Sequence, residues 1–131
     1  MPDGPLPRLR VLAVDDEEPV LQVLGDLLVM LGQDVEIAQG GAAGIERYSP
    51  ERFDVVFTDL GMPEVNGWDV VQAVKSRSPD TPVVIVTGWG AQIEGRALHA
   101  RGVDHVIAKP FSLEDVRDVL LKVGVRPAQA A

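Results

Sequence analysis

Five polar residues of this 131-residue chain stand at or just after the ends of short apolar runs, where strands would end. They are Asp15, Asp16, Asp59, Thr87 and Lys109. In open parallel sheets, ligands bind beyond the carboxyl ends of the strands. We therefore expect these side chains to converge on one site if the strands that carry them are neighbours.

Together these side chains supply what phosphoryl transfer to a carboxylate requires. Carboxylates packed closely repel one another, at roughly 4 kcal/mol for a pair ~4 Å apart in an effective dielectric of about 20. Such a cluster demands protonation or a hard divalent cation, and Mg²⁺ prefers oxygen ligands and binds phosphoryl oxygens. An aspartate can then act as the nucleophile and form an acyl phosphate, while lysine and threonine hold phosphoryl oxygens.

The elements that would position these residues alternate along the chain. Short apolar runs, most of them rich in Val and Ile, are typical of parallel strands covered on both faces. They span 10–14, 34–38, 54–58, 82–87 and 103–108. Helical spacing of apolar residues predicts helices from Val20 to Leu31 and over 41–48, 67–77, 91–101 and 112–123. Ser112 and Asp115 form a loose capping box at the start of the last helix.

This alternation predicts the fold class and the domain organisation. Five strands alternating with five helices imply an α/β fold, a doubly wound (βα)5 three-layer sandwich with right-handed crossovers. We expect a flexible lead-in at 1–8, one domain at 9–124 and a flexible tail at 125–131, because Pro, Gly and Ala dominate the two ends.

Composition narrows the classes of partner. Twelve Lys and Arg against twenty Asp and Glu give a net charge of -8, which disfavours direct binding to nucleic acid or to anionic membranes. The absence of Cys excludes disulfides and thiolate metal sites. No run approaches the ~20 apolar residues of a membrane span, and the start lacks the apolar core of a signal peptide. We expect a cytoplasmic location.

Four motifs in this order resemble the receiver domain of two-component response regulators. They are VDDEE, DLGMPEVNG, VTG and KPF, and the resemblance covers about residues 9–124. It implies a flavodoxin-like parallel sheet with the strand order 2-1-3-4-5. It also implies self-catalysed phosphorylation and dephosphorylation of an aspartate, without turnover of a separate small molecule.

The resemblance assigns a role to each residue of the expected site. Asp59 would be the phosphoacceptor, Thr87 the switch hydroxyl and Lys109 the phosphate-binding cation. Asp15 and Asp16 would bind Mg²⁺ together with Asp59 and the main-chain carbonyl of Gly61. The family pattern also predicts a cis peptide bond between Lys109 and Pro110.

The partner implied by the resemblance is a histidine kinase or a phosphotransfer protein, whose phosphohistidine would donate to Asp59. Signal output to a downstream protein would use the surface of the fourth helix, fifth strand and fifth helix, at 91–123. A homodimer through the same surface also fits the family. The sequence itself names neither the kinase nor the output.

Several residues depart from the family pattern or have two interpretations. Val106 stands where receivers commonly carry an aromatic switch residue. Trp89 is either an exposed loop aromatic or a shield over the phosphoryl group, and Trp68 is interpreted as packing. His99 and His105 are not at carboxyl ends of strands and are interpreted as structural or solvated.

Alternative functions remain open at this point. VVFTDLG resembles the nucleophile strand of haloacid dehalogenase-type phosphatases, but Gly61 stands where those enzymes place a second aspartate. A flavodoxin-like electron carrier would have a Ser/Thr-rich loop where this chain has DDEEP. A degenerate receiver that only binds partners is the third alternative, although the complete set of site residues argues against it.

Overall fold

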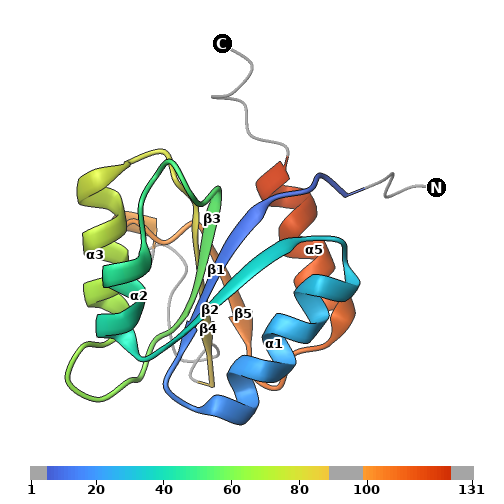
Figure 1. The fold of residues 1–131 in the computed structure, drawn as a ribbon, viewed down its shortest axis with the longest axis horizontal. Coiled ribbons are helices and arrows are strands. Elements are labelled where there is room, and N and C mark those ends of the chain that lie inside the picture. The colour runs from blue at the N-terminus through green and yellow to red at the C-terminus, as the bar shows by residue number, and fades with distance from the viewer. Residues whose placement is uncertain (1–5, 89–98, 125–131) are drawn as a thin grey trace.

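The structure is a computed structural model that describes residues 6–88 and 99–124. Its parallel strands form one sheet in the order β2-β1-β3-β4-β5, which confirms the predicted topology (Figure 1). The strands are β1 (Arg10–Asp15), β2 (Asp34–Gln39), β3 (Val55–Asp59), β4 (Val83–Thr87) and β5 (His105–Ala108). Because β1 lies between β2 and β3, the chain reverses its direction of winding there, which creates a topological switch point.

Helices cover both faces of the sheet, as Figure 1 shows: α1 and α5 lie on one face, and α2 and α3 on the other. Their bounds are α1 (Glu18–Met30), α2 (Gly41–Arg47), α3 (Gly67–Arg77) and α5 (Leu113–Gly124). The helix expected over 91–101 lies largely outside the described residues; of its end, residues 99–100 are helical. Among the described residues, no helix has the length and hydropathy needed to cross a membrane.

Two apolar cores hold the three layers together. Alternate side chains of a strand point to opposite faces, so Val11 and Ala13 enter the core beneath α1 and α5, whereas Leu12 and Val14 enter the core beneath α2 and α3. All four side chains are completely buried. Burial on both faces explains the continuous apolar runs of the sequence.

Reciprocal capping boxes start two of the helices. At α5 the predicted box is confirmed, because the Ser112 hydroxyl accepts from the Asp115 N–H and the Asp115 carboxylate accepts from the Ser112 N–H. Asn66 and Asp69 form the same arrangement at α3. These boxes satisfy N–H groups that the first helical turn leaves without a partner.

Matched charges close the amino edge of the sheet, where the strands begin. Ion pairs here are Arg8–Asp34, Arg10–Asp54 and Lys75–Asp104. The Gln33 amide also donates to the Pro7 carbonyl, at 2.9 Å. Residues 6–8 therefore contact the domain.

Candidate functional site

An acidic loop follows β1 at the carboxyl edge of the sheet. The Asp15 side chain is almost fully buried, and its Oδ1 accepts from the Glu17 N–H at 2.9 Å. Carboxylate oxygens of Asp15, Asp16 and Glu17 lie within 4.8 Å of one another. Glu17 was not among the predicted site residues, although the run of acids in DDEE could have indicated that it belongs to this cluster.

The loop after β3, residues 59–66, lies at the same edge. Asp59 is buried, and Gly61 is exposed two residues later. The Gly67 N–H donates to the Leu60 carbonyl at 2.9 Å. A Cβ atom on Gly67 would stand 2.3 Å from the Asp59 carbonyl oxygen, so only glycine permits this close approach.

Lys109 joins the two loops. Its Nζ lies 3.2 Å from Asp15 Oδ2 and 3.2 Å from Asp59 Oδ1, and 3.9 Å from Glu17 Oε1. The Lys109 N–H donates to the Thr87 carbonyl at 2.9 Å, which places buried Thr87 beside this strand end. The peptide bond between Lys109 and Pro110 is cis, as predicted. The structure thus brings together residues from the ends of β1, β3, β4 and β5.

The electrostatics of the site favour an added positive charge. Burial raises the pKa of the Asp59 carboxyl, the charge of Asp15 raises it further, and Lys109 opposes both effects. Burial lowers the pKa of Lys109, but the nearby carboxylates of Asp15 and Asp59 outweigh it, so that pKa is raised. One lysine therefore faces more negative charge than it neutralises.

The donor set fits a hard divalent cation. The grouped oxygens of Asp15, Asp16 and Glu17 all belong to carboxylates. The carboxylates of Asp59 and Asp15 both contact the ammonium group of Lys109. Mg²⁺ binds through a few carboxylates and keeps several waters, so an open loop of this kind suits it. The Gly61 carbonyl belongs to the loop that follows Asp59.

Comparison with known proteins identifies the family. The response regulator receiver domain family matches residues 11–121. The chain belongs to this family. It is 32% identical over 108 residues to the response regulator MprA of Mycobacterium leprae, covering 82% of this chain and 47% of MprA. The chain thus spans about half the length of that relative.

Solved structures agree with this assignment. A receiver domain protein from Clostridium thermocellum superposes with a TM-score of 0.84 at 27% identity, covering 93% of this chain and 98% of that chain. The receiver domain of sensor histidine kinase PA1611 from Pseudomonas aeruginosa has a TM-score of 0.79 at 20% identity, with coverage of 91% and 100%. That structure has a magnesium ion coordinated in its active-site cleft. Neither the phosphatase nor the electron-carrier alternative gains support from these matches.

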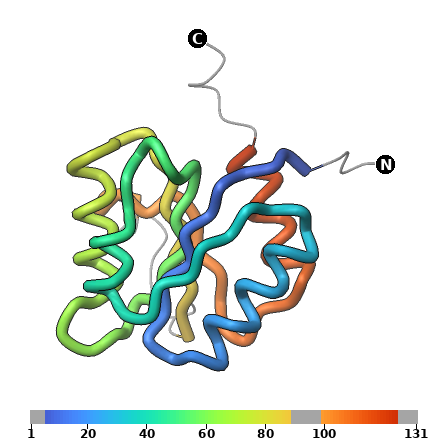
Figure 2. The backbone as a smooth tube through the Cα atoms, viewed as in Figure 1, coloured from blue at the N-terminus to red at the C-terminus, as the bar shows by residue number. Residues whose placement is uncertain are grey.

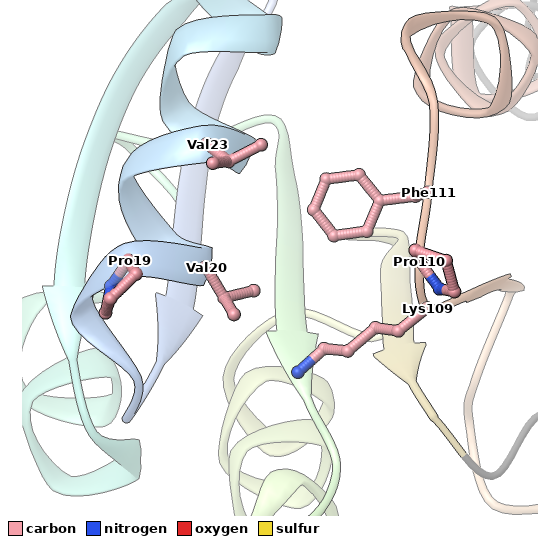
Figure 3. A pocket seen from close by; sticks show the side chains of 6 residues that line it. All are labelled: Pro19, Val20, Val23, Lys109, Pro110 and Phe111. Atoms are coloured by element: carbon pink, nitrogen blue, oxygen red, sulfur yellow. The ribbon is translucent and has the colours of Figure 1, made fainter.

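An apolar groove of about 450 Å³ lies beside the receiver's acidic site (Figure 3). Pro19, Val20 and Val23 of α1 form one wall, and Pro110 and Phe111 form the other. Figure 3 shows the Lys109 side chain extending from the second wall toward the carboxyl end of β3. The groove therefore opens next to the lysine that contacts Asp59.

Val106 and Trp68 both pack against the core beneath α2 and α3. Val106 is half-buried there. The guanidinium of Arg101 also stacks on the Trp68 ring, 3.7 Å from its centroid. Trp89 lies outside the described residues.

Proposed function

We propose that Asp59 is the phosphoacceptor of this receiver. The observation that carries the proposal is the position of Lys109 Nζ, 3.2 Å from both the Asp59 and the Asp15 carboxylates at the carboxyl edge of the sheet. A carboxylate held beside a cation and a metal-binding cluster is arranged for phosphoryl transfer, which depends chiefly on positioning and charge stabilisation.

In the proposed transfer, an Asp59 carboxylate oxygen attacks the phosphorus of a phosphohistidine. An O–P bond forms while the P–N bond breaks, and the electron pair returns to the imidazole. Lys109 faces the phosphoryl oxygens and offsets their charge. The Thr87 hydroxyl would donate to another phosphoryl oxygen, as the resemblance implies.

Asp15, Asp16 and Asp59 would hold Mg²⁺ with the Gly61 carbonyl, and Glu17 extends the acidic set. When bound, the cation offsets the negative charge that the carboxylates and the phosphoryl group bring together. The close grouping of carboxylate oxygens supports this assignment. The protein's own residues set the position of the nucleophile and of Lys109.

The phosphodonor would be a histidine kinase or a phosphotransfer protein in the cytoplasm. The apolar groove between α1 and Phe111 supports a docking place next to Asp59, since Val23 is 51% exposed there. Exposed Glu17 and Glu18 border it, which favours a donor surface that is apolar with a basic rim. We expect Val23→Asp to slow transfer from a phosphorylated donor but not from acetyl phosphate.

Output would run through the surface that includes β5 and α5, where a downstream protein or a second copy of the chain would bind. Val106, which is half-buried on β5, stands at that surface in place of the usual aromatic residue. The proposed surface also includes residues 91–98, which lie outside the described residues.

Intact mass spectrometry after incubation with Mg²⁺ and acetyl phosphate tests the central assignment. We expect one phosphoryl adduct on the wild type and none on Asp59→Asn. Equal labelling of the two proteins, or no labelling of the wild type, would contradict the proposal. No labelling of the wild type would also favour the degenerate receiver that only binds partners.

A further inference from the structure

The turn between β2 and α2, residues 39–41, lies between the two loops that carry the site, as the backbone trace in Figure 2 shows. On one side it contacts the acidic loop: the Gly40 N–H donates to the Asp15 carbonyl at 3.0 Å, and the Gln39 Nε2 donates to the Asp16 carbonyl at 3.2 Å. The turn thus holds two successive peptide groups of the acidic loop.

On its other side the same turn abuts the loop after β3, residues 59–66. A Cβ atom on Gly41 would stand 2.1 Å from the Val65 carbonyl oxygen, so any side chain would push the turn and the loop apart. The Val65 N–H in turn donates to the Pro63 carbonyl at 2.7 Å. The turn therefore has a fixed place between the loops, and Gln39 reaches the acidic loop from a defined position.

We propose that Gln39 is a positioning residue for the Mg²⁺ site, an inference that rests on the proposed function. Asp15 is fixed by its place in β1 and by hydrogen bonds to its carbonyl and its carboxylate. Asp16 lies one residue beyond the strand, where the Gln39 amide binds its carbonyl. That bond restrains the peptide group that follows Asp16, and with it the direction in which the Asp16 side chain leaves the main chain. Groups that orient metal ligands tune the affinity for the metal.

The chemistry of position 39 requires a hydrogen-bond donor. The partner is a carbonyl oxygen, which only accepts, so the glutamine must present its NH₂ group. Glutamate at this position would have no proton to donate and would add a negative charge beside Asp15, Asp16 and Glu17. Methionine would keep the length of the side chain and remove the donor alone, which separates the two effects.

Titration of the full chain with MgCl₂, followed by its thermal unfolding midpoint, tests the inference. Binding to the folded state raises this midpoint by an amount that grows with the ratio of the Mg²⁺ concentration to the dissociation constant. We expect Gln39→Met to require about tenfold more Mg²⁺ than the wild type for the same rise, in line with other groups that orient metal ligands. Gln39→Glu should require more still, and both variants should regain acetyl phosphate labelling at saturating Mg²⁺.

Gln22→Met and Gln22→Glu are the matched controls, because Gln22 is exposed on α1 near the same loop. They should titrate like the wild type. The inference would be overturned if Gln39→Met reached the same rise at a Mg²⁺ concentration within twofold of the wild-type value, or if Gln22→Met required as much extra Mg²⁺ as Gln39→Met. If the wild type takes one phosphoryl group and responds to Mg²⁺ but Gln39→Met responds equally, the role of Gln39 fails and the proposed function stands. If the wild type gives no response to Mg²⁺, both fail.

Discussion

The amino edge and the carboxyl edge of the sheet differ in how their positive and negative side chains balance. At the amino edge, three cations face three carboxylates, in the pairs Arg8–Asp34, Arg10–Asp54 and Lys75–Asp104. At the carboxyl edge, Lys109 is the one cation among residues 6–88 and 99–124 that pairs with Asp15, Asp59 and Glu17, and Asp16 lies nearby. The three pairs of the first edge balance one another, whereas the second edge has an excess of carboxylates, of which Asp15 and Asp59 are buried.

This difference separates stability from function within one sheet. Matched charges that also bind main-chain groups fix the starts of the strands, whereas an excess of buried carboxylates costs stability unless a ligand offsets it. The carboxyl edge is the place where open parallel sheets bind ligands. Mg²⁺ should therefore change the stability of variants at the carboxyl edge, relative to the wild type, but not that of variants at the amino edge.

The largest effect is expected for Lys109→Met without Mg²⁺. The substitution leaves the nearly buried Asp15 and Asp59 carboxylates without their cation, which should lower the free energy of unfolding by about 3 kcal/mol. Urea unfolding in EDTA measures this loss. Mg²⁺ should restore more stability to the variant than to the wild type, because it supplies the missing positive charge.

The same variant has a pH signature. Because the pKa of Lys109 is raised in the folded protein, its contribution is complete below the ordinary lysine value and is lost as pH rises through the folded value. The gap between wild type and Lys109→Met should therefore close at high pH. Lys122→Met, which removes an exposed lysine of α5, is the control. A loss equal to that of Lys109→Met would contradict the special position of Lys109.

A smaller loss is expected at the amino edge for Asp104→Ala. The Asp104 carboxylate accepts from the Val83 N–H and from Lys75 Nζ, each at 2.8 Å. Its removal should lower the free energy of unfolding by about 2 kcal/mol, as for hydrogen bonds to a charged group. Asp104→Asn, which keeps an acceptor for Val83, should lose less in the same urea titration. If Mg²⁺ rescued Asp104→Ala as it rescues Lys109→Met, the contrast between the edges would be false.

How much of this the sequence predicts depends on whether a residue's role is local. Asp59 and Lys109 are predictable, because strand ends in a parallel sheet deliver groups to one edge, and Ser112 and Asp115 cap their own helix. Gln39 and Gly41 were missed, because their contacts depend on how β2 lies beside β1 and on the fold of the loop after β3. Arg101 was missed for the same reason, since its stacking on Trp68 joins distant parts of the chain.

Asp59→Asn should change stability in the opposite direction from the previous variants. Burial and the charge of Asp15 raise the pKa of Asp59, so its ionised form disfavours the folded state at neutral pH. Without Mg²⁺, the variant should therefore be more stable than the wild type at pH 7. The gain should shrink as pH falls, because wild-type Asp59 becomes protonated. A variant less stable than the wild type in EDTA would contradict the view that this edge is strained by charge.

The smallest effect is expected for His105→Gln, on β5. Burial lowers the pKa of His105, Lys122 lowers it further, and Asp104 opposes the shift. A depressed folded pKa means that the stabilisation is complete above the ordinary histidine value and is lost as pH falls through the folded value. The wild type should therefore lose slightly more stability than His105→Gln when the pH falls from neutral to 5. The extra loss should be less than about 1 kcal/mol, because the His105 side chain is partly exposed. The His105 side chain lies away from the acidic site, so Mg²⁺ should leave the stability difference between the two proteins unchanged. A difference that depended on Mg²⁺ would mean that the charges of the two edges are coupled through β5.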